Sequence, residues 1–333
     1  MSCEQGNGGT GDSKRNDASP NTEYRIPNTD YGLRITDYGL RITDYGLRTT
    51  HYAQTMTVIG PVLIDGRPVE AEDAVISIFD IGFQRGYGCF EAMRSYDGSI
   101  FRLEPHLDRL ELSAAKLRLP TPDRESISSW CRSAAETAGE SVVRVFISGG
   151  TDARAPGTDS RVVVLADVVN PGSVPMTVQS RMAPWHTDGD WSELTGAKAL
   201  SYGFNLAASV AAQGDGFGDA LLIGGSGHVL EGPTFSIGWI SQGVFHTPGL
   251  KIGILESITR AAVIEVAGRI GMSVTEGVYE LDDVMSADEV FAMSTVREVL
   301  SIVQVDDLDF SVGPATERLQ RGFSSLVDEE LHR

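Results

Sequence analysis

The stretch "LTGAKALSYGFNLAA", residues 194–208, places a single lysine, Lys198, in a run of small and apolar residues. The chain has only three other lysines, at positions 14, 116 and 251. A lysine among apolar neighbours is expected to have a lowered pKa, because desolvation disfavours the ammonium form. The neutral amine is a nucleophile that typically reacts with carbonyl groups. The alternative is a half-buried helix from which Lys198 extends its amine to solvent.

Composition predicts a globular protein of about two domains, since the chain has 333 residues of which 41% are hydrophobic. The net charge of −19 argues against nucleic acid or an anionic membrane as the main partner. The three cysteines are unclustered and the six histidines lack metal-ligand spacing. We therefore expect neither a disulfide framework nor a metal site.

Localisation is predicted from two further features. No apolar run reaches the length of about 18 residues that a membrane-spanning helix needs, and the first residues lack the apolar core of a signal peptide. Both features favour a cytoplasmic protein.

Residues 1–55 differ in composition from the rest of the chain. They begin rich in Gly, Asn and Ser, and then repeat a seven-residue unit, "TDYGLRI", from Thr29 to Thr49. Each unit contains a glycine and few large aliphatic residues, which weakens a helix and a coiled-coil seam alike. We predict a disordered extension. The repeat either has a function or is a translated DNA repeat upstream of a true start at Met56.

From Met56 onwards the pattern is that of a folded protein. The segment "TVIGPVLIDGRPVE" predicts strand, turn and strand, and "EPHLDRLELSAAKLRL" has leucines at helical spacing. Two β-rich runs follow, and residues 171–191 are rich in Pro, Asp and Gly, which is typical of a connection between domains. Beyond them, helix-like and strand-like runs alternate. The sequence predicts an α/β or α+β fold, with a small domain at 56–178 and a larger one at 187–325.

Two further segments suggest a binding site for a charged cofactor. In "HVLEGPTFSI", Glu231 lies among apolar residues, where an unpaired carboxylate is costly. In "LESITRAAVIEVAGRIGM", Ser257 precedes a strongly periodic helix, whose N-terminus can bind an anion or can simply be capped by Ser257. "FAMSTVREVL" repeats this arrangement of hydroxyl residues before an apolar run. Pyridoxal phosphate (PLP) requires such a set: a lysine, a carboxylate for its ring nitrogen, and a phosphate site with a cation.

The chain resembles the class IV, fold type IV PLP-dependent aminotransferases, which include branched-chain and D-amino acid aminotransferases and aminodeoxychorismate lyase. The resemblance runs from about Thr57 to Phe323. It rests on the order and spacing of five segments: "FDIGFQRGYGCFEAMRSYDGSIFRLEPHLDRLELSAAKL", "AKALSYGFNLAA", "DALLIGGSGHVLEG", "TPGLKIGILESITR" and "ADEVFAMSTVREVLSI". It implies a two-domain fold like that of D-amino acid aminotransferase, with PLP between the domains, and a homodimer.

The resemblance also implies roles for single residues. Lys198 is expected to form the Schiff base with PLP and to act as the catalytic residue. Glu231 is expected to face the pyridine nitrogen, and Tyr202 to lie near the ring. The residues expected at the phosphate are Arg109, Ser257, Ile258, Thr259 and Thr295.

The substrate side departs from the family pattern. Ser236 stands about where an asparagine is expected, and Ser257 replaces the usual glycine. For the substrate, the resemblance implies Phe90 and either Arg144, as in branched-chain enzymes, or Arg154, in a Gly-rich loop. Arg154 is followed by Ala-Pro rather than the x-His of D-amino acid enzymes, which disfavours D-specificity.

The predicted activity is transfer of an amino group from an amino acid, with a branched-chain donor favoured, to a 2-oxo acid. The alternatives are a lyase of the 4-amino-4-deoxychorismate type, a D-amino acid aminotransferase, and a relative that binds PLP without catalysis.

Overall fold

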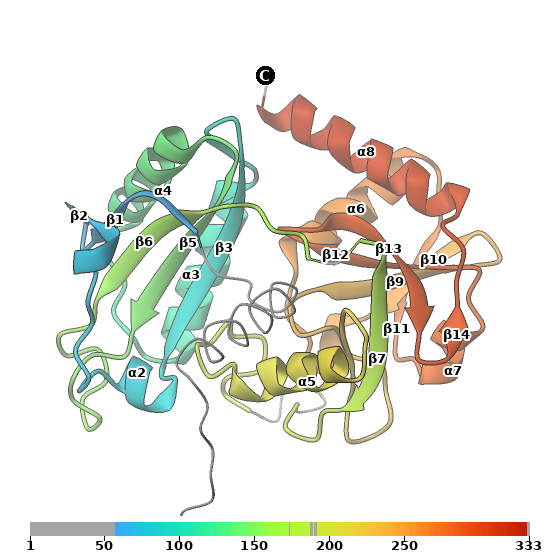
Figure 1. The fold of residues 1–333 in the computed structure, drawn as a ribbon, viewed down its shortest axis with the longest axis horizontal. Helices are drawn as coiled ribbons and strands as arrows, with labels where there is room; N and C mark the ends of the chain where they lie inside the picture. Colours follow the sequence, from blue (N-terminus) through green and yellow to red (C-terminus); the bar gives the residue numbers. More distant parts are fainter. Residues whose placement is uncertain (1–56, 173, 187–188, 190–191, 332–333) are drawn as a thin grey trace, which may run out of the picture. The chain divides into compact units, whose positions relative to one another are not determined.

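The computed structural model describes residues 57–172, 174–186, 189 and 192–331, whose strands form two sheets (Figure 1). The extension predicted over residues 1–55 lies outside the described residues.

The first sheet is antiparallel throughout and has the order β2-β1-β6-β5-β3-β4. Asp65 and Gly66, both with positive φ, form the predicted turn between its first two strands. The bounds are β1 Val58–Ile64, β2 Arg67–Val69, β3 Gly88–Tyr96, β4 Ser99–Ile100, β5 Ser141–Ser148 and β6 Val162–Asp167.

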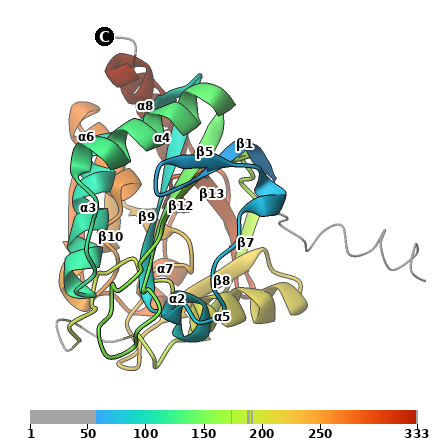
Figure 2. The same ribbon diagram turned by 90° about the vertical axis from the view of Figure 1, so that its left-hand side faces the viewer.

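Two helices, α3 (Leu103–Lys116) and α4 (Arg124–Ala138), cover one face of this sheet (Figure 2). Leu107 and Leu110 of α3, and Leu117 at its C-terminal end, are buried in the core beneath the helices, as their helical spacing predicts. A short helix, α2 (Ile81–Arg85), and a 3₁₀ turn at Ala71–Asp73 precede β3.

The second sheet has the order β11-β10-β9-β12-β13-β7-β8, with β14 paired to β13. It is mixed, because β10 and β11, β13 and β7, and β7 and β8 run parallel. Its strands are β7 Met176–Met182, β8 Asp219–Ile223, β9 Ser236–Ser241, β10 Val244–Pro248, β11 Val274–Gly277, β12 Glu289–Ser294, β13 Glu298–Val305 and β14 Leu308–Asp309.

Helix α6 buries much of the apolar run that the sequence predicted to be a periodic helix after Ser257. One core lies between the sheet and the helices α6 and α8, and includes Val263, Val266 and Phe323. Another lies under α5, around Ala208 and Leu222. The helices are α5 Gly203–Gly214, α6 Ile258–Arg269, α7 Leu281–Met285 and α8 Pro314–Leu331, with a 3₁₀ turn at Leu250–Ile252.

The predicted connection at residues 171–191 contains a strand that the sequence did not reveal. β7 (Met176–Met182) pairs with β8 and β13, so residues 176–178 lie in a strand of the second sheet. Only Met176 and Val178 of this strand bury apolar side chains in the described core, a signal too short to outweigh the surrounding Pro and Gly. The domain boundaries at 178 and 187 remain predictions.

A second difference concerns the hydroxyl residues of "FAMSTVREVL". They were expected to precede a helix, but Thr295 lies in a turn between β12 and β13. The apolar run that follows is a strand, and periodicity over so few residues does not separate a buried strand from a helix.

None of the helices within the described ranges has the length and apolar character needed to cross a membrane.

Candidate active site

The segment around Lys198 lies against the beginning of β3. The Phe90 N–H donates to the Lys198 carbonyl at 3.0 Å, and the Leu200 N–H donates to the Gly88 carbonyl at 2.8 Å. A Cβ on Gly88 would lie 2.6 Å from the Ile147 carbonyl oxygen and 2.6 Å from the Leu200 side chain, so only glycine permits this approach. Lys198 is therefore placed by main-chain pairing rather than by a flexible loop.

Helix α3 holds the same segment from the other side. The buried Ser113 hydroxyl accepts from the Lys198 N–H at 3.0 Å and donates to the Arg109 carbonyl at 2.8 Å. One turn further, Lys116 Nζ donates to the Thr195 carbonyl at 2.5 Å. The backbone on the N-terminal side of Lys198 is thus held by α3, while the backbone on its C-terminal side pairs with β3.

The electrostatic surroundings of Lys198 favour its neutral amine. Nζ lies 4.5 Å from the centroid of the Phe90 ring. Burial and the positive charge of Arg109 lower its pKa from 10.5 to about 8, against the opposing effect of the carboxylates of Glu91 and Glu231. The expectation of a lysine with a lowered pKa is met, so about a tenth of the amine is unprotonated at pH 7, compared with less than about a thousandth for an ordinary lysine.

Arg109 projects from α3 into a buried ion pair. Its Nε and Nη2 donate to the two oxygens of Glu91 at 2.7 and 2.8 Å, while Nη1 donates to the Glu256 carbonyl at 2.7 Å. Glu91 has no exposed surface. Burial alone would raise its pKa, but the charge and hydrogen bonds of Arg109, helped by His106, lower it to about 2. Arg109 is consequently held in one orientation.

The contact with Glu256 brings Arg109 to the N-terminus of α6. Ser257 caps this helix, and its hydroxyl accepts from the Arg260 N–H at 3.2 Å. The first N–H groups of a helix have no intrahelical acceptor. Those of Ile258 and Thr259 can therefore bind an anion next to the Arg109 guanidinium. The phosphate-binding role of Thr295 stays a prediction, because Thr295 lies in the turn after β12 and not at the start of a helix.

Glu231 and Tyr202 lie on the second half of the chain. Glu231 Oε1 accepts from the Leu255 N–H at 3.1 Å and lies 3.5 Å from His186 Nε2. Its side chain is mostly buried. Tyr202 immediately precedes α5, and its ring meets Phe90 edge-on at 6.1 Å. Burial and the negative charge of Glu231 raise the pKa of Tyr202, which therefore stays protonated.

The two candidate substrate arginines have different surroundings. Arg144 lies beside Phe146 on β5, and Phe146 stacks on Phe90 with centroids 6.1 Å apart. Its only ion pair in the described chain, to Asp167, is long at 3.4 Å, and its buried Nε has no hydrogen-bond partner there. The positive charge of Arg144 also acts on Lys198. Arg154 is exposed in the loop between β5 and β6.

Several residues at this site were not singled out from the sequence. Glu91 occupies one of the alternating buried positions of β3. An acid at such a position of an apolar strand is the pattern that could have indicated a functional residue. On α3, His106, Arg109, Ser113 and Lys116 recur at helical spacing and form a polar stripe beside the buried leucines. Such a stripe on an amphipathic helix could have indicated the site.

The arrangement meets the requirements of PLP. An oriented guanidinium and a helix N-terminus suit a phosphate, a lysine of lowered pKa suits an aldehyde, and a buried carboxylate suits a protonated ring nitrogen.

Comparison with known proteins agrees with this chemistry. The model of the amino-transferase class IV family matches residues 88–305. A putative branched-chain-amino-acid aminotransferase of Methanocaldococcus jannaschii is 29% identical over 80% of this chain and 96% of its own length. Aminodeoxychorismate lyase of Bacillus subtilis is 28% identical over 81% and 96%. A D-alanine aminotransferase of Listeria monocytogenes is 30% identical over 79% and 94%.

Solved structures show the same fold. The branched-chain amino acid aminotransferase of Escherichia coli matches with a TM-score of 0.74 and 25% identity over 81% of this chain and 95% of its own. A second branched-chain amino acid aminotransferase, solved in complex with N-(5'-phosphopyridoxyl)-L-glutamate, matches with a TM-score of 0.75. The chain belongs to the class IV aminotransferase family. It is a PLP-dependent aminotransferase with the fold type IV architecture, and PLP is its cofactor.

The lowered pKa of Lys198 predicts how the cofactor-free protein takes up PLP. Only the neutral amine attacks an aldehyde, and its fraction grows as pH rises through the pKa. Stopped-flow absorbance should show an uptake rate that rises with pH around a midpoint near 8 rather than 10.5. Lys251→Arg serves as the control and should leave the profile unchanged. A midpoint near 10.5 in the native chain contradicts the burial assigned to Lys198.

Proposed function

We propose that the enzyme transfers the amino group of a branched-chain L-amino acid to a 2-oxo acid, with Lys198 as the catalytic residue. The observation that carries the proposal is the Lys198 amine, held by α3 and β3, with a pKa lowered to about 8. An exposed lysine with an ordinary pKa would be protonated and unreactive near neutral pH.

Each residue of the site has a distinct part in this proposal. Bound PLP supplies an aldehyde that binds amino groups and a ring that withdraws electrons from the substrate. Lys198 Nζ binds the cofactor covalently and, once released, accepts the proton from the substrate Cα. Glu231 holds the proton on the ring nitrogen. Arg109, Ser257, Ile258, Thr259 and Thr295 bind the phosphate, and Tyr202 lies at the ring.

The choice of a branched-chain donor rests on the open face of the first sheet. Phe90 and Phe146 form an apolar wall there, and Arg144 beside it has unused hydrogen-bonding capacity. A substrate with an apolar side chain and a carboxylate matches this site, because the side chain can contact the two phenyl rings while the carboxylate binds Arg144. The relatives named as branched-chain aminotransferases support it.

A donor panel distinguishes this proposal from the lyase alternative, which the similar identity of the B. subtilis lyase keeps open. The PLP-loaded enzyme is supplied with 2-oxoglutarate and with leucine, isoleucine, valine or D-alanine, and in parallel with aminodeoxychorismate alone. We expect the highest kcat/KM with a branched-chain L-amino acid. Product from aminodeoxychorismate without an acceptor, at a higher kcat/KM, identifies a lyase instead.

The substrate carboxylate should be bound by Arg144 rather than by Arg154. A hydrogen bond to a charged group contributes about 1.5–3 kcal/mol, so Arg144→Ala should lower kcat/KM by roughly tenfold to a hundredfold. Arg154→Ala, the matched control, should remain within about twofold of the native chain, since its side chain is exposed. A large loss in Arg154→Ala and none in Arg144→Ala assigns the carboxylate to the loop.

A homodimer is proposed from two groups of exposed apolar side chains. Ile78, Phe79 and Phe83 lie next to or within α2, and Phe204 and Val210 project from α5, each with more than half of its surface exposed. Groups of large apolar residues on a surface typically mark protein–protein interfaces. Sedimentation should give twice the monomer mass of 35.8 kDa, and Phe83→Asp should shift it towards the monomer. A native chain that sediments as a monomer contradicts the proposal.

A cytoplasmic location is proposed as well. The thiols of Cys89 and Cys131 are free and buried, as expected of a chain from a reducing compartment. Recovery of the enzyme in a membrane or secreted fraction contradicts this location.

A further inference from the structure

Phe101 and Arg102 form the corner between β4 and α3. Arg102 adopts the left-handed conformation, with φ of 52° and ψ of 46°, and α3 begins at the next residue. A residue other than glycine costs about 1 kcal/mol or more in this conformation. Contacts of the Arg102 side chain are therefore needed to offset this backbone cost.

The corner inserts into the core of the second sheet's helices. Phe101 is 5% exposed and belongs to the apolar core between α6 and α8, although it follows a strand of the first sheet. Its ring meets Phe323 of α8 in a T-shaped contact at 5.6 Å. The start of α3 is thus packed against helices of the second sheet.

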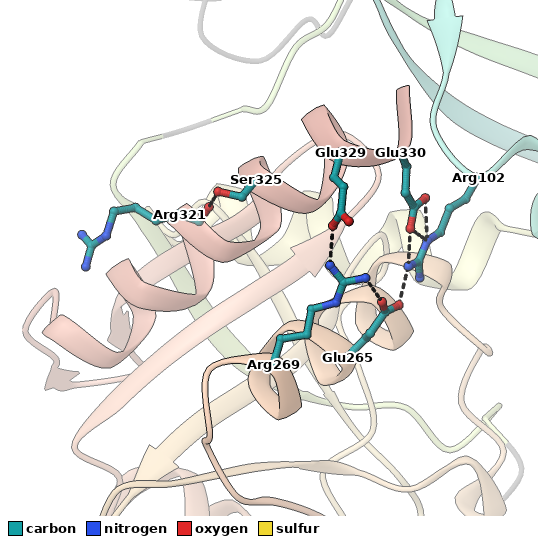
Figure 3. A network of polar contacts seen from close by, with 7 residues as sticks. All are labelled: Arg102, Glu265, Arg269, Arg321, Ser325, Glu329 and Glu330. Atoms are coloured by element: carbon teal, nitrogen blue, oxygen red, sulfur yellow. Dashed lines mark hydrogen bonds and ion pairs between the residues drawn. The ribbon is translucent and has the colours of Figure 1, made fainter. Parts of the chain in front are cut away.

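Arg102 adds a polar bridge to both of these helices (Figure 3). Its Nη2 lies 2.5 Å from Glu265 Oε2 on α6 and 2.8 Å from Glu330 Oε1 on α8. Nε donates to Glu330 as well, at 3.3 Å. The Arg102 side chain is only 15% exposed, so these ion pairs are screened less than pairs at an open surface.

Arg269 makes a similar bridge without touching α3. It contacts Glu265 at 2.7 Å and Glu329 at 2.6 Å, and so joins α6 to α8 (Figure 3). Arg102 and Arg269 share one carboxylate and the same two helices. They differ in that only Arg102 fastens the start of α3.

Two turns along α3, Arg109 makes its own contact with the segment before α6. Its Nη1 donates to the Glu256 carbonyl at 2.7 Å. Helix α3 is therefore attached to the α6 segment at two points, about 10 Å apart along α3 by the rise of an α-helix. The outer point, Arg102, limits how far the helix can tilt or slide about the inner one.

We propose that Arg102 is a positioning residue for cofactor binding: it holds α3 against α6 so that the Arg109 guanidinium stays beside the N-terminus of α6. The proposal rests on the phosphate-binding role of Arg109 in the proposed function. Arg102 acts through Arg109 and does not touch the cofactor. Its removal weakens the binding of PLP without removing any group that touches the cofactor.

Removal of the Arg102 guanidinium is expected to weaken PLP binding only moderately. A hollow of about 690 Å³, lined in part by Ser99, Glu104 and Glu136, lies beside Arg102 and admits water to the carboxylates. The apolar contact of Phe101 also remains when the guanidinium is removed. We expect Arg102→Gln to raise the Kd for PLP about two- to fivefold, as loss of a partly screened ion pair implies.

The test titrates PLP into the full chain after removal of its cofactor. Arg102→Gln should bind PLP more weakly, and Arg102→Lys, which restores the charge, should recover part of the loss. Arg269→Gln is the matched control and should bind like the native chain. The apparent pKa for PLP uptake at Lys198 should be native in Arg269→Gln and should rise in Arg102→Gln, because a displaced Arg109 lowers the pKa of Lys198 less. Glu330→Gln, which removes the negative charge on α8, repeats the test should Arg102→Gln fail to fold.

A double-variant cycle shows whether Arg102 acts through Arg109. In an Arg109→Ala background, Arg102→Gln should have no further effect on the Kd, because the group that it positions is gone. The proposal is overturned if Arg102→Gln binds PLP like the native chain, if Arg269→Gln weakens binding equally, or if the loss is the same in both backgrounds. If Arg109→Ala binds PLP as tightly as the native chain, that result contradicts the phosphate-binding role of Arg109 in the proposed function, on which the role of Arg102 rests.

Discussion

The site depends on the buried ion pair between Glu91 and Arg109. Burying two charges is costly unless good geometry and further hydrogen bonds compensate. Here the carboxylate receives two hydrogen bonds from Arg109 and one contact from His106, and the guanidinium has a third acceptor at Glu256. The pair therefore has one satisfied arrangement, and that arrangement determines where α3 lies against β3 and α6.

The alternation of β3 connects this pair to Lys198. Phe90 and Glu91 are neighbours on the strand, so their side chains point to opposite faces. Glu91 fixes Arg109 on the helix side, while Phe90 lies under the Lys198 amine on the open side. Helix α3 completes the connection, since Ser113 joins the Arg109 carbonyl to the Lys198 N–H. The charge that we propose binds the phosphate and the amine that we propose binds PLP are thus held by one strand and one helix.

Much of the fold and the family could be predicted from the sequence. The periodic leucines of α3, the Asp-Gly turn and the run after Ser257 depend on local pattern, and the structure confirms the elements that they predicted. The class IV family, its fold and its cofactor are confirmed by the comparisons. The roles of Lys198, Glu231 and the phosphate-binding residues stay predictions, although the structure places Arg109 and Glu231 around Lys198.

What the sequence did not reveal depends on long-range contacts. β7 gains its strand conformation from β8 and β13, whose residues are distant in the chain. Arg102 resembles any surface arginine until α6 and α8 bring Glu265 and Glu330 to it, more than 160 positions away. Glu91 looked like one acid among many, because only folding removes it from water.

The central claim is that Lys198 is the lysine that binds PLP. The most direct measurement is borohydride reduction of the purified PLP-bound enzyme, followed by peptide mapping. The reduced pyridoxyl group should be found on the peptide that contains Lys198, whose amine lies against Phe90 and has a pKa lowered to about 8. Its presence on Lys116 or Lys251 instead would contradict the account.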